Sequence, residues 1–112
     1  MSEQVYHFEF KPSFDMREFR RTLELAVLAA EILHGADAVR LDGKHCFDGR
    51  TYRCLIDGRG APGRDIARLF SGFVARKFGP KSFRVFRLDG NFHDAVAEND
   101  AEAIRKMMRG GR

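Results

Sequence analysis

Two amphipathic helix patterns, each lying between segments of strand-like alternation, constrain the fold of this chain more than any other feature. Apolar residues recur at helical spacing over residues 15–33 and again over residues 62–78. Before, between and after these segments, apolar and polar residues alternate, as they do in a strand with one buried face. Because 112 residues is the length of one domain, we expect both kinds of element to share one core.

Residues at the boundaries of these elements carry their own signals. Asp15 and Glu18 have the spacing of a capping box at the start of the first helix, and Gly35 follows that helix as a C-cap. The hairpin in the middle of the chain is expected to have a tight turn at Asp48 and Gly49. The expected strands are residues 5–10, two strands within residues 38–57, and residues 83–88.

The predicted order of elements is strand, helix, strand, strand, helix, strand, followed by a weakly amphipathic segment at residues 91–108. With right-handed crossovers, this order places two helices on one face of a four-stranded antiparallel sheet. The sequence therefore predicts an α+β, ferredoxin-like βαββαβ sandwich with an additional C-terminal helix. We expect a single domain over residues 1–109 and a disordered tail over residues 110–112. Since this architecture hosts many unrelated functions, it does not itself assign one.

The first helix has a second apolar stripe beside the one that faces the core, formed by Leu25, Leu28 and Ile32. Two interpretations of this stripe stay open. The C-terminal helix could cover it with Ile104 and Met108. Alternatively, the stripe is exposed and joins copies of the chain or a different protein, because contiguous exposed apolar patches mark interfaces.

Basic residues are concentrated in the middle of the chain. Residues 50–87 hold ten basic side chains against two acidic ones, whereas the segments on either side hold more acidic than basic side chains. We expect these cations and the Gly-rich turn before the second helix to bind an anionic partner, nucleic acid in the first place or an acidic protein surface. The candidate anion-binding residues are Arg53, Arg59, Gly60, Gly63, Arg64, Arg68, Arg76 and Arg84.

The same concentration of charge also fits two roles without a ligand. The arginines could be only the solvated face of an amphipathic helix. Alternatively, acidic side chains such as Glu24 and Glu31 could neutralise them within the molecule or in a neighbouring copy. The salt dependence of binding separates these roles from ligand binding, because log affinity for a polyanion falls with log salt at a slope of roughly 0.7 to 0.9 per neutralised phosphate.

The helix-free face of the predicted sheet is a second candidate binding surface. RNA-binding modules of this architecture stack bases on aromatic residues of the two central strands. Here the outward positions, none of them aromatic, are Val5, His7, Glu9, Thr51, Arg53 and Leu55. This argues against base stacking on the central strands, and the pattern leaves open whether the fourth strand turns Phe86, or Phe83 and Val85, to this face. The polar side chains expected there, which could meet a phosphate backbone or an acidic partner, are His7, Arg40, Lys44 and Arg53.

Residues 58–63 match the pattern G-x-G-x-x-G between a predicted strand and a predicted helix. Dinucleotide-binding units place an acidic residue about 20 positions after the first glycine, and here Asp89 lies 31 positions after it. Pro62 also removes a backbone N–H from the turn that would hold a pyrophosphate. We therefore interpret the segment as a connecting loop or a general anion site, and predict no cofactor.

No set of residues indicates a catalytic or metal site. The candidates are His7, His45, Cys46 and Cys54. Alternation places Cys54 and His45 on the inner face of the sheet and the other two on the outer face, so four ligands cannot converge. A thiol on a covered face is usually inert. We predict no metal and no catalytic residue.

The sequence also bears on the setting of the protein. Two cysteines are too few for a disulfide framework, and we find no export signal, so we expect a reducing, cytoplasmic environment. The most apolar window, residues 23–33, contains two glutamates and is shorter than the roughly 20 residues that cross a bilayer, so we expect no membrane partner.

Our leading hypothesis is a small non-catalytic binding module for an anionic partner, with nucleic acid as the first choice. The alternative is a homo-oligomeric adaptor, a homodimer for example, that binds another protein through Leu25, Leu28 and Ile32.

Overall fold

The computed structural model describes residues 3–110 and has an α+β fold. Its four strands form one antiparallel sheet with the order β2-β3-β1-β4, so β1 and β3 are central and β2 and β4 are edges. The predicted α+β class and the four-stranded antiparallel sheet are therefore confirmed. The elements are β1 (Glu3–Phe10), α1 (Met16–His34), α2 (Ala36–Asp42), β2 (His45–Asp48), β3 (Arg53–Asp57), α3 (Ala61–Phe78), β4 (Phe83–Asp89) and α4 (Phe92–Gly110).

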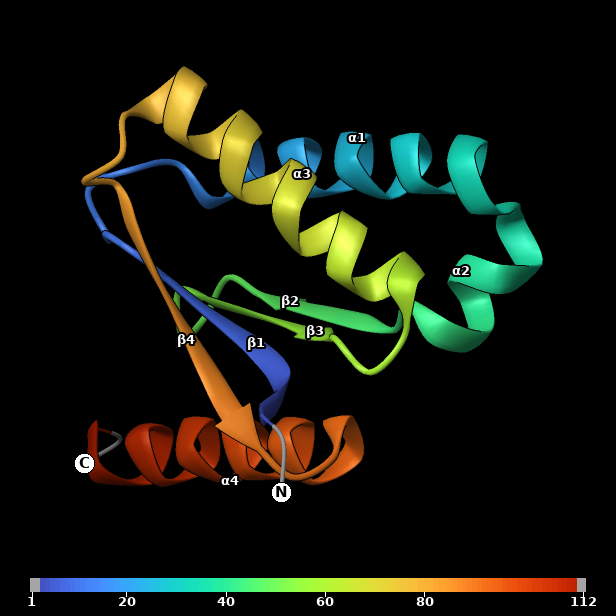
Figure 1. The fold of residues 1–112 in the computed structure, drawn as a ribbon. Coiled ribbons are helices and arrows are strands. Elements are labelled where there is room, and N and C mark those ends of the chain that lie inside the picture. The colour runs from blue at the N-terminus through green and yellow to red at the C-terminus, as the bar shows by residue number, and fades with distance from the viewer. Residues whose placement is uncertain (1–2, 111–112) are drawn as a thin grey trace.

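The main core lies between the sheet and the pair of helices α1 and α3, which cover one of its faces (Figure 1). Alternation along β1 points Phe8 and Phe10 toward these helices, and both side chains are buried. Phe10 stacks on Phe19 of α1 with ring centroids 4.5 Å apart, and Phe8 packs against Phe70 of α3 at 4.9 Å. Aromatic side chains from three elements therefore fix how the two helices sit on the sheet.

The opposite face of the sheet is covered by α4 (Figure 1). Val5, Leu55 and Phe92 are buried there in a second cluster that also includes Leu88 and Val96. The expectation of a helix-free polar face is therefore wrong. Val5 and Leu55 are neighbouring outward positions on the central strands, and together they form an apolar patch that α4 removes from water.

Polar contacts, here called the α4 seam, attach α4 to the hairpin end of the sheet. The Asn99 amide donates to the Asp48 carboxylate at 3.0 Å, and Arg53 donates to the Asn99 side-chain oxygen at 3.2 Å and to Glu102. Asp48 and Asn99 are buried. Because every member of this network has a partner, the network can be buried without an unsatisfied polar group.

The segment at residues 38–42 is helical, which corrects the prediction that a strand begins there. Val39 and Leu41 alternate as in a strand, but only Val39 is buried. Arg40 and Asp37 are three residues apart on α2 and form an ion pair at 3.5 Å, so Arg40 is not on the sheet. Lys44 lies in the connection to β2, where its carbonyl oxygen accepts from the Asp57 N–H.

The hairpin turn between β2 and β3 is longer than predicted. Asp48 pairs with Arg53 across the hairpin, which leaves residues 49–52 in the turn. Tyr52 has φ 57°, a conformation that a residue with a side chain adopts at a cost, and it is partly exposed instead of facing the core. The Asp48 carboxylate accepts from the Arg50 backbone N–H at 3.0 Å and thereby holds the turn.

Of the two residues predicted to form a capping box at the start of α1, only Asp15 caps the helix. The Asp15 carboxylate accepts from the Arg17 N–H at 2.9 Å. The Glu18 carboxylate does not reach back to the cap and instead contacts Arg21 and Lys77, so Glu18 links α1 to α3. At the other end, Gly35 ends α1 with φ 91°, as its predicted role as C-cap requires.

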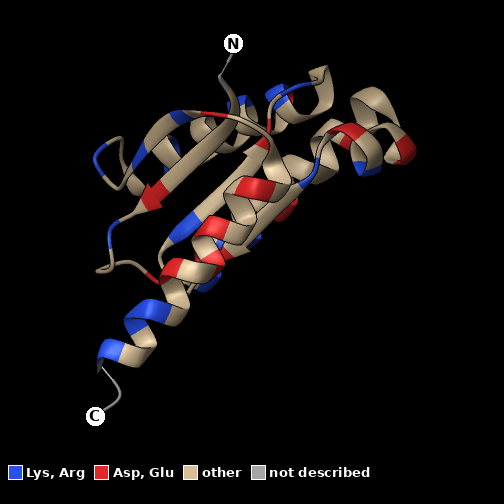
Figure 2. Cartoon of the chain, turned by 90° about the horizontal axis from the view of Figure 1, so that it is seen from below, with Lys and Arg blue, Asp and Glu red and all other residues tan. Residues whose placement is uncertain are grey.

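The C-terminal segment forms one helix whose C-terminal end extends past the sheet (Figure 2). Because α4 lies on the face opposite α1, it does not cover the second apolar stripe of α1, and Leu25, Leu28 and Ile32 remain exposed. Of the tail predicted at residues 110–112, Gly110 ends α4 and the other two residues lie outside the described range. Within residues 3–110, no helix combines the length and the apolar character that crossing a bilayer requires.

Candidate anion-binding groove

A groove of about 500 Å³ runs between α3 and the edge strand β4. Its α3 side consists of side chains at positions 64, 67, 68 and 71, a spacing that places them on one face of a helix. Its other side comes from alternate positions of β4 and from β1. The lining residues are Tyr6, Arg64, Ala67, Arg68, Ser71, Val85 and Arg87.

Arg87 and Tyr6 form the sheet side of the groove as a unit. They are direct partners in the register of β1 and β4. The Arg87 guanidinium lies 5.1 Å from the centroid of the Tyr6 ring and donates to the Tyr6 hydroxyl at 3.4 Å. Stacking on the ring holds the planar guanidinium in place while it leaves other N–H groups available to a ligand.

On the helix side, Arg64 and Arg68 lie one turn apart. Arg64 donates to the carbonyl oxygens of Gly58 and Arg59 at 3.4 and 3.0 Å, which directs its side chain toward the start of α3. Arg68 is exposed, and its side chain forms no ion pair or hydrogen bond within residues 3–110. Ser71 donates its hydroxyl proton to the Ala67 carbonyl at 2.8 Å.

The groove has three guanidinium groups and no carboxylate among its lining residues. Arg64, Arg68 and Arg87 each form no ion pair with a described residue. Because no carboxylate of the described residues lines the groove, no opposite charge among them is in direct contact with these three guanidinium groups. An arrangement of this kind can bind phosphate or carboxylate groups, since a guanidinium donates two parallel hydrogen bonds to either.

Three of the predicted anion-binding arginines have carboxylate partners elsewhere. Arg53 is held by Glu102 in the α4 seam and is only 20% exposed. The Arg59 side chain donates to both oxygens of the buried Asp57 carboxylate, at 3.2 Å to Oδ1 and 3.0 Å to Oδ2. Arg84 contacts Glu9 at 3.3 Å and lies over the Phe86 ring on the α4 side of the sheet. The Arg53 hydrogen bond also lowers the pKa of the Glu102 carboxyl.

The remaining candidates, Arg76, Gly60 and Gly63, do not line the groove. Arg76 lies beside a hollow between α1 and α3 that Leu25 and Phe73 also line. Gly60 caps α3 without a side-chain hydrogen bond and lies against Asp42. A Cβ at Gly63 would stand 1.7 Å from the Asp57 carbonyl oxygen, so Gly63 is needed for the close approach of α3 to β3. The ten cations of residues 50–87 therefore do not share one surface.

Five groove residues were not among the predicted site residues: Tyr6, Ala67, Ser71, Val85 and Arg87. The helix spacing of Arg64, Arg68 and Ser71 is visible in the sequence and places all three on one face of α3. The pairing of Tyr6 with Arg87 depends on the position of β4 beside β1, which no local pattern reveals.

The histidine and thiol candidates are separated as alternation predicts, and His45 lies on the predicted inner side, where it lines a pocket beside α1. Cys54 is buried in the main core and Cys46 packs on the α4 side, whereas His45 is exposed and bonds to the Gly43 carbonyl through Nδ1 at 2.9 Å. Burial raises the pKa of both thiols, so neither thiol gains nucleophilic character from its surroundings. Burial under α4 lowers the pKa of His7, and the Arg53 charge lowers it further.

The chain was compared with protein-family models, with curated proteins and with solved structures, and none of them matches it.

Proposed function

We propose that this protein is a small non-catalytic binding module whose α3–β4 groove engages the phosphate groups of a nucleic acid. The observation that carries the proposal is the presence of Arg64, Arg68 and Arg87 around one groove that has no carboxylate in its lining. Of the ten cations counted in the sequence, three thus line one groove without a carboxylate partner among the described residues, and the proposed site is these three residues together with Tyr6 and Ser71.

Phosphate is the preferred ligand because of the geometry of the donors. Arg64 and Arg68 are separated by one helical turn, about 6 Å, and successive phosphates of a nucleic acid strand lie at a comparable spacing. The Tyr6 ring is already stacked against Arg87, so bases have no free aromatic surface in the groove. Binding is therefore expected to depend on the backbone and to be insensitive to base sequence.

The expected fold type fits this use of the molecule. The strand order β2-β3-β1-β4, with α1 and α3 on one face, is the order that a ferredoxin-like arrangement has, and we propose that this chain has that topology with α4 added on the second face. The groove lies at the free edge of β4, where an extended strand has room to pass. A reducing, cytoplasmic setting stays a prediction from the sequence.

The experiment is a titration of a fluorescent oligonucleotide with the purified protein at several salt concentrations. With three phosphates bound, log affinity should fall against log salt with a slope of about 2 to 3. Combining Arg64→Glu with Arg68→Glu should weaken binding by roughly tenfold or more, because two attractive charges become repulsive.

Arg76→Glu is the matched control. Arg76 is also an exposed α3 arginine, but it does not line the groove, so its reversal should change affinity by less than about threefold. Equal losses for the two variants would mean that general charge, and not the groove, holds the ligand. Salt-independent binding, or a stronger response to an acidic peptide than to the oligonucleotide, would also overturn the proposal.

A second candidate function is protein binding through the α1 stripe formed by Leu25, Leu28 and Ile32. The exposure of these side chains favours it, since they are 54%, 53% and 78% exposed and α4 lies on the other side of the sheet. Contiguous exposed apolar side chains on one helix mark an interaction surface. Leu28→Glu is expected to abolish partner binding and leave the fold and oligonucleotide binding unchanged, and loss of the fold would show that the stripe is core.

A further inference from the structure

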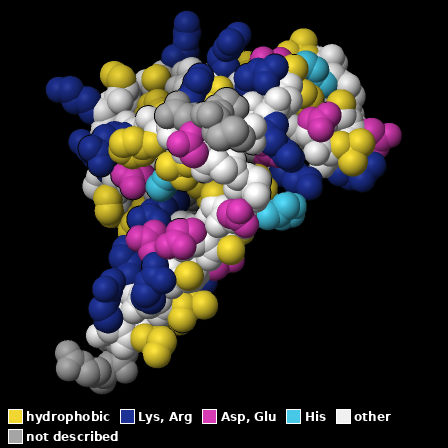
Figure 3. All heavy atoms as spheres, turned by 60° about the horizontal axis from the view of Figure 1, so that its bottom comes forward, with side chains coloured by type: hydrophobic (Ala, Val, Ile, Leu, Met, Phe, Trp, Pro, Cys, Tyr) yellow, Lys and Arg dark blue, Asp and Glu magenta, His cyan; other side chains and the backbone are white. Residues whose placement is uncertain are grey.

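The C-terminal end of α4 is an amphipathic arm whose large apolar side chains are left exposed by the described residues. Ile104, Met107 and Met108 are 56%, 66% and 75% exposed and fall on one face of the helix at i, i+3 and i+4. Figure 3 shows this arm extending from the body, with hydrophobic side chains along one side and basic ones along the other. The basic side chains are Arg105, Lys106 and Arg109.

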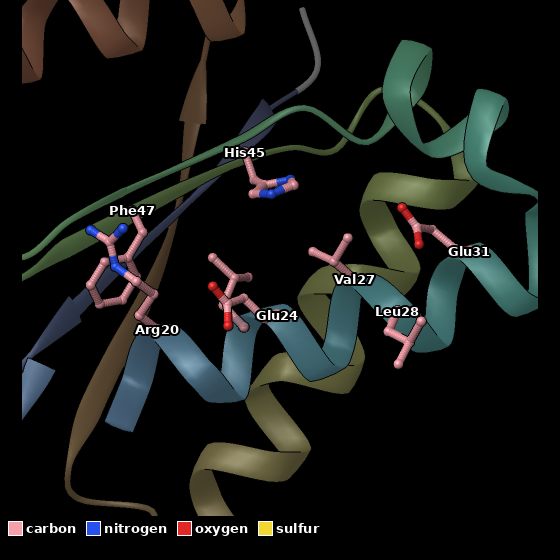
Figure 4. A pocket seen from close by; sticks show the side chains of 8 residues that line it. Arg20, Glu24, Val27, Leu28, Glu31, His45 and Phe47 are labelled. Carbon is pink, nitrogen blue, oxygen red and sulfur yellow. The ribbon is translucent and has the colours of Figure 1, made fainter. Parts of the chain in front are cut away.

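A groove of complementary character lies between α1 and β2. It has a volume of about 290 Å³ and an apolar lining that includes Leu23, Val27, Leu28 and Phe47. Two acidic residues, Glu24 and Glu31, border it, and neither carboxylate has an ion-pair partner within residues 3–110 (Figure 4). Its one arginine, Arg20, lies over the Phe47 ring, 5.2 Å from the centroid.

The arm and the α1 groove are complementary in apolar surface and in charge. The arm offers flexible methionine and isoleucine side chains, which fill an irregular apolar groove well. Lys106 and Arg109 form no ion pair with a described residue. The groove has two carboxylates that likewise form no ion pair with a described residue. Opposite charges around an apolar contact favour one orientation and one partner over others.

The arm cannot reach the α1 groove of its own chain, because the two lie on opposite sides of the sheet (Figure 1). Residues 92–103 of α4 are attached to the sheet by Phe92, Ala103 and the α4 seam, which fixes the direction of the arm. Any chain that places this arm in this groove is therefore a second copy.

We propose that two copies of the protein associate by inserting the α4 arm of one copy into the α1 groove of the other. The contact is reciprocal in a closed dimer, since each copy carries both an arm and a groove. This inference rests on the second candidate function, because the α1 groove shares Leu28 with the α1 stripe, and it names the protein bound at α1 as a further copy of the chain.

The test uses cysteine cross-linking of the full chain in a Cys46→Ser background, in which the remaining Cys54 is fully buried. One protein carries Leu28→Cys in the groove and the other carries Met108→Cys in the arm. A disulfide-linked dimer is expected when the two proteins are mixed under mild oxidation, and not when either is oxidised alone. Arg68→Cys mixed with Met108→Cys is the control for random collision, and it should give no dimer.

Any different outcome overturns the inference. Cross-linking of Leu28→Cys with itself would mean that α1 packs on α1, which keeps the second candidate function and removes the arm. Cross-linking of Met108→Cys with itself would place arm against arm. Absence of the mixed dimer, whatever mass light scattering gives, or equal cross-linking of the Arg68→Cys control, would also contradict the inference.

Charge reversal gives an independent measurement by sedimentation. Glu24→Arg combined with Glu31→Arg should weaken self-association by roughly tenfold, because two attractive pairs are replaced by repulsion. Adding Lys106→Glu and Arg109→Glu to the same chain should restore it. If the additional changes do not restore self-association, the proposed pairing of arm and groove is wrong. Oligonucleotide binding at the α3–β4 groove is not affected by that outcome.

Discussion

The α3–β4 groove and the α4 seam take their arginines from the same basic segment and place them in opposite surroundings. In the seam, Arg53 is mostly buried between Asn99 and Glu102. In the groove, Arg68 is exposed and no carboxylate lies in the lining. The first arginine holds two elements together, whereas the second is available to a ligand. The density of charge along a sequence therefore does not tell which cations are available, because availability depends on where the acidic side chains fold.

The largest effect that separates these two regions is expected on stability. Arg53→Ala should lower the free energy of unfolding by about 2 kcal/mol, because it removes charged hydrogen bonds and leaves Glu102 and the buried Asn99 oxygen without their donor. Arg68→Ala should change it by less than about 0.5 kcal/mol. Urea unfolding of both variants measures this difference. Similar losses in the free energy of unfolding for the two variants would mean that the seam arginine and the groove arginine do not differ in their contribution to stability.

The second effect is a dependence of stability on pH below neutrality, which we assign to His7 under α4. Burial and then the Arg53 charge lower the pKa of His7 from its ordinary value of 6.5, while Glu9 and Glu102 oppose this shift. The unfolded chain therefore binds a proton at a higher pH than the folded one, and stability falls as the pH drops below about 6.5, by at most about 1.4 kcal/mol per pH unit.

Unfolding midpoints at pH 7.5 and pH 5.5 test this assignment. His7→Phe should reduce the difference between the midpoints at the two pH values. His93→Gln, a change at an exposed histidine, should leave that difference the same as in the parent chain. If the parent chain is equally stable at both values, the folded protein protonates His7 as readily as the unfolded one does.

The smallest effect is expected at Arg84, which has a carboxylate partner but lies in solvent. Its contact with Glu9 joins side chains that are 74% and 33% exposed. Exposed pairs of this kind contribute about 0 to 1 kcal/mol, so Arg84→Ala should lower stability by less than about 0.5 kcal/mol and less still in 1 M salt. A loss as large as that of Arg53→Ala would show that burial is not what distinguishes the two ion pairs.

Much of the fold follows from local patterns in the sequence. The alternation at residues 5–10 orients β1 correctly, and Asp15 and Gly35 lie at the two ends of α1 as predicted. The strand predicted from residue 38 is wrong because the apolar residues Val39 and Leu41 are too few to distinguish the strand period from the helix period, whereas the three-residue spacing of Asp37 and Arg40 favours a helix.

The location of α4 and the composition of the groove could not be read from such patterns. An amphipathic pattern predicts that a helix has an apolar face, but it does not predict which surface of the molecule that face packs against. A signal was present for α4, because Val5 and Leu55 are apolar at outward positions of adjacent strands and need a cover. For the groove, Arg87 joins Arg64 and Arg68 only through the order of strands, which depends on long-range packing.

The free edge of β4 has a further consequence for how copies of this protein behave when concentrated. An exposed edge strand is a template for adding strands from other molecules, and natural proteins often protect such edges with charge. Arg84 and Arg87 on β4, preceded by Lys81, would be brought against the same cations in another copy. Arg87, which we assign to ligand binding, is thus also one of the charges along this edge, and a polyanion bound to it would reduce the repulsion between two such edges.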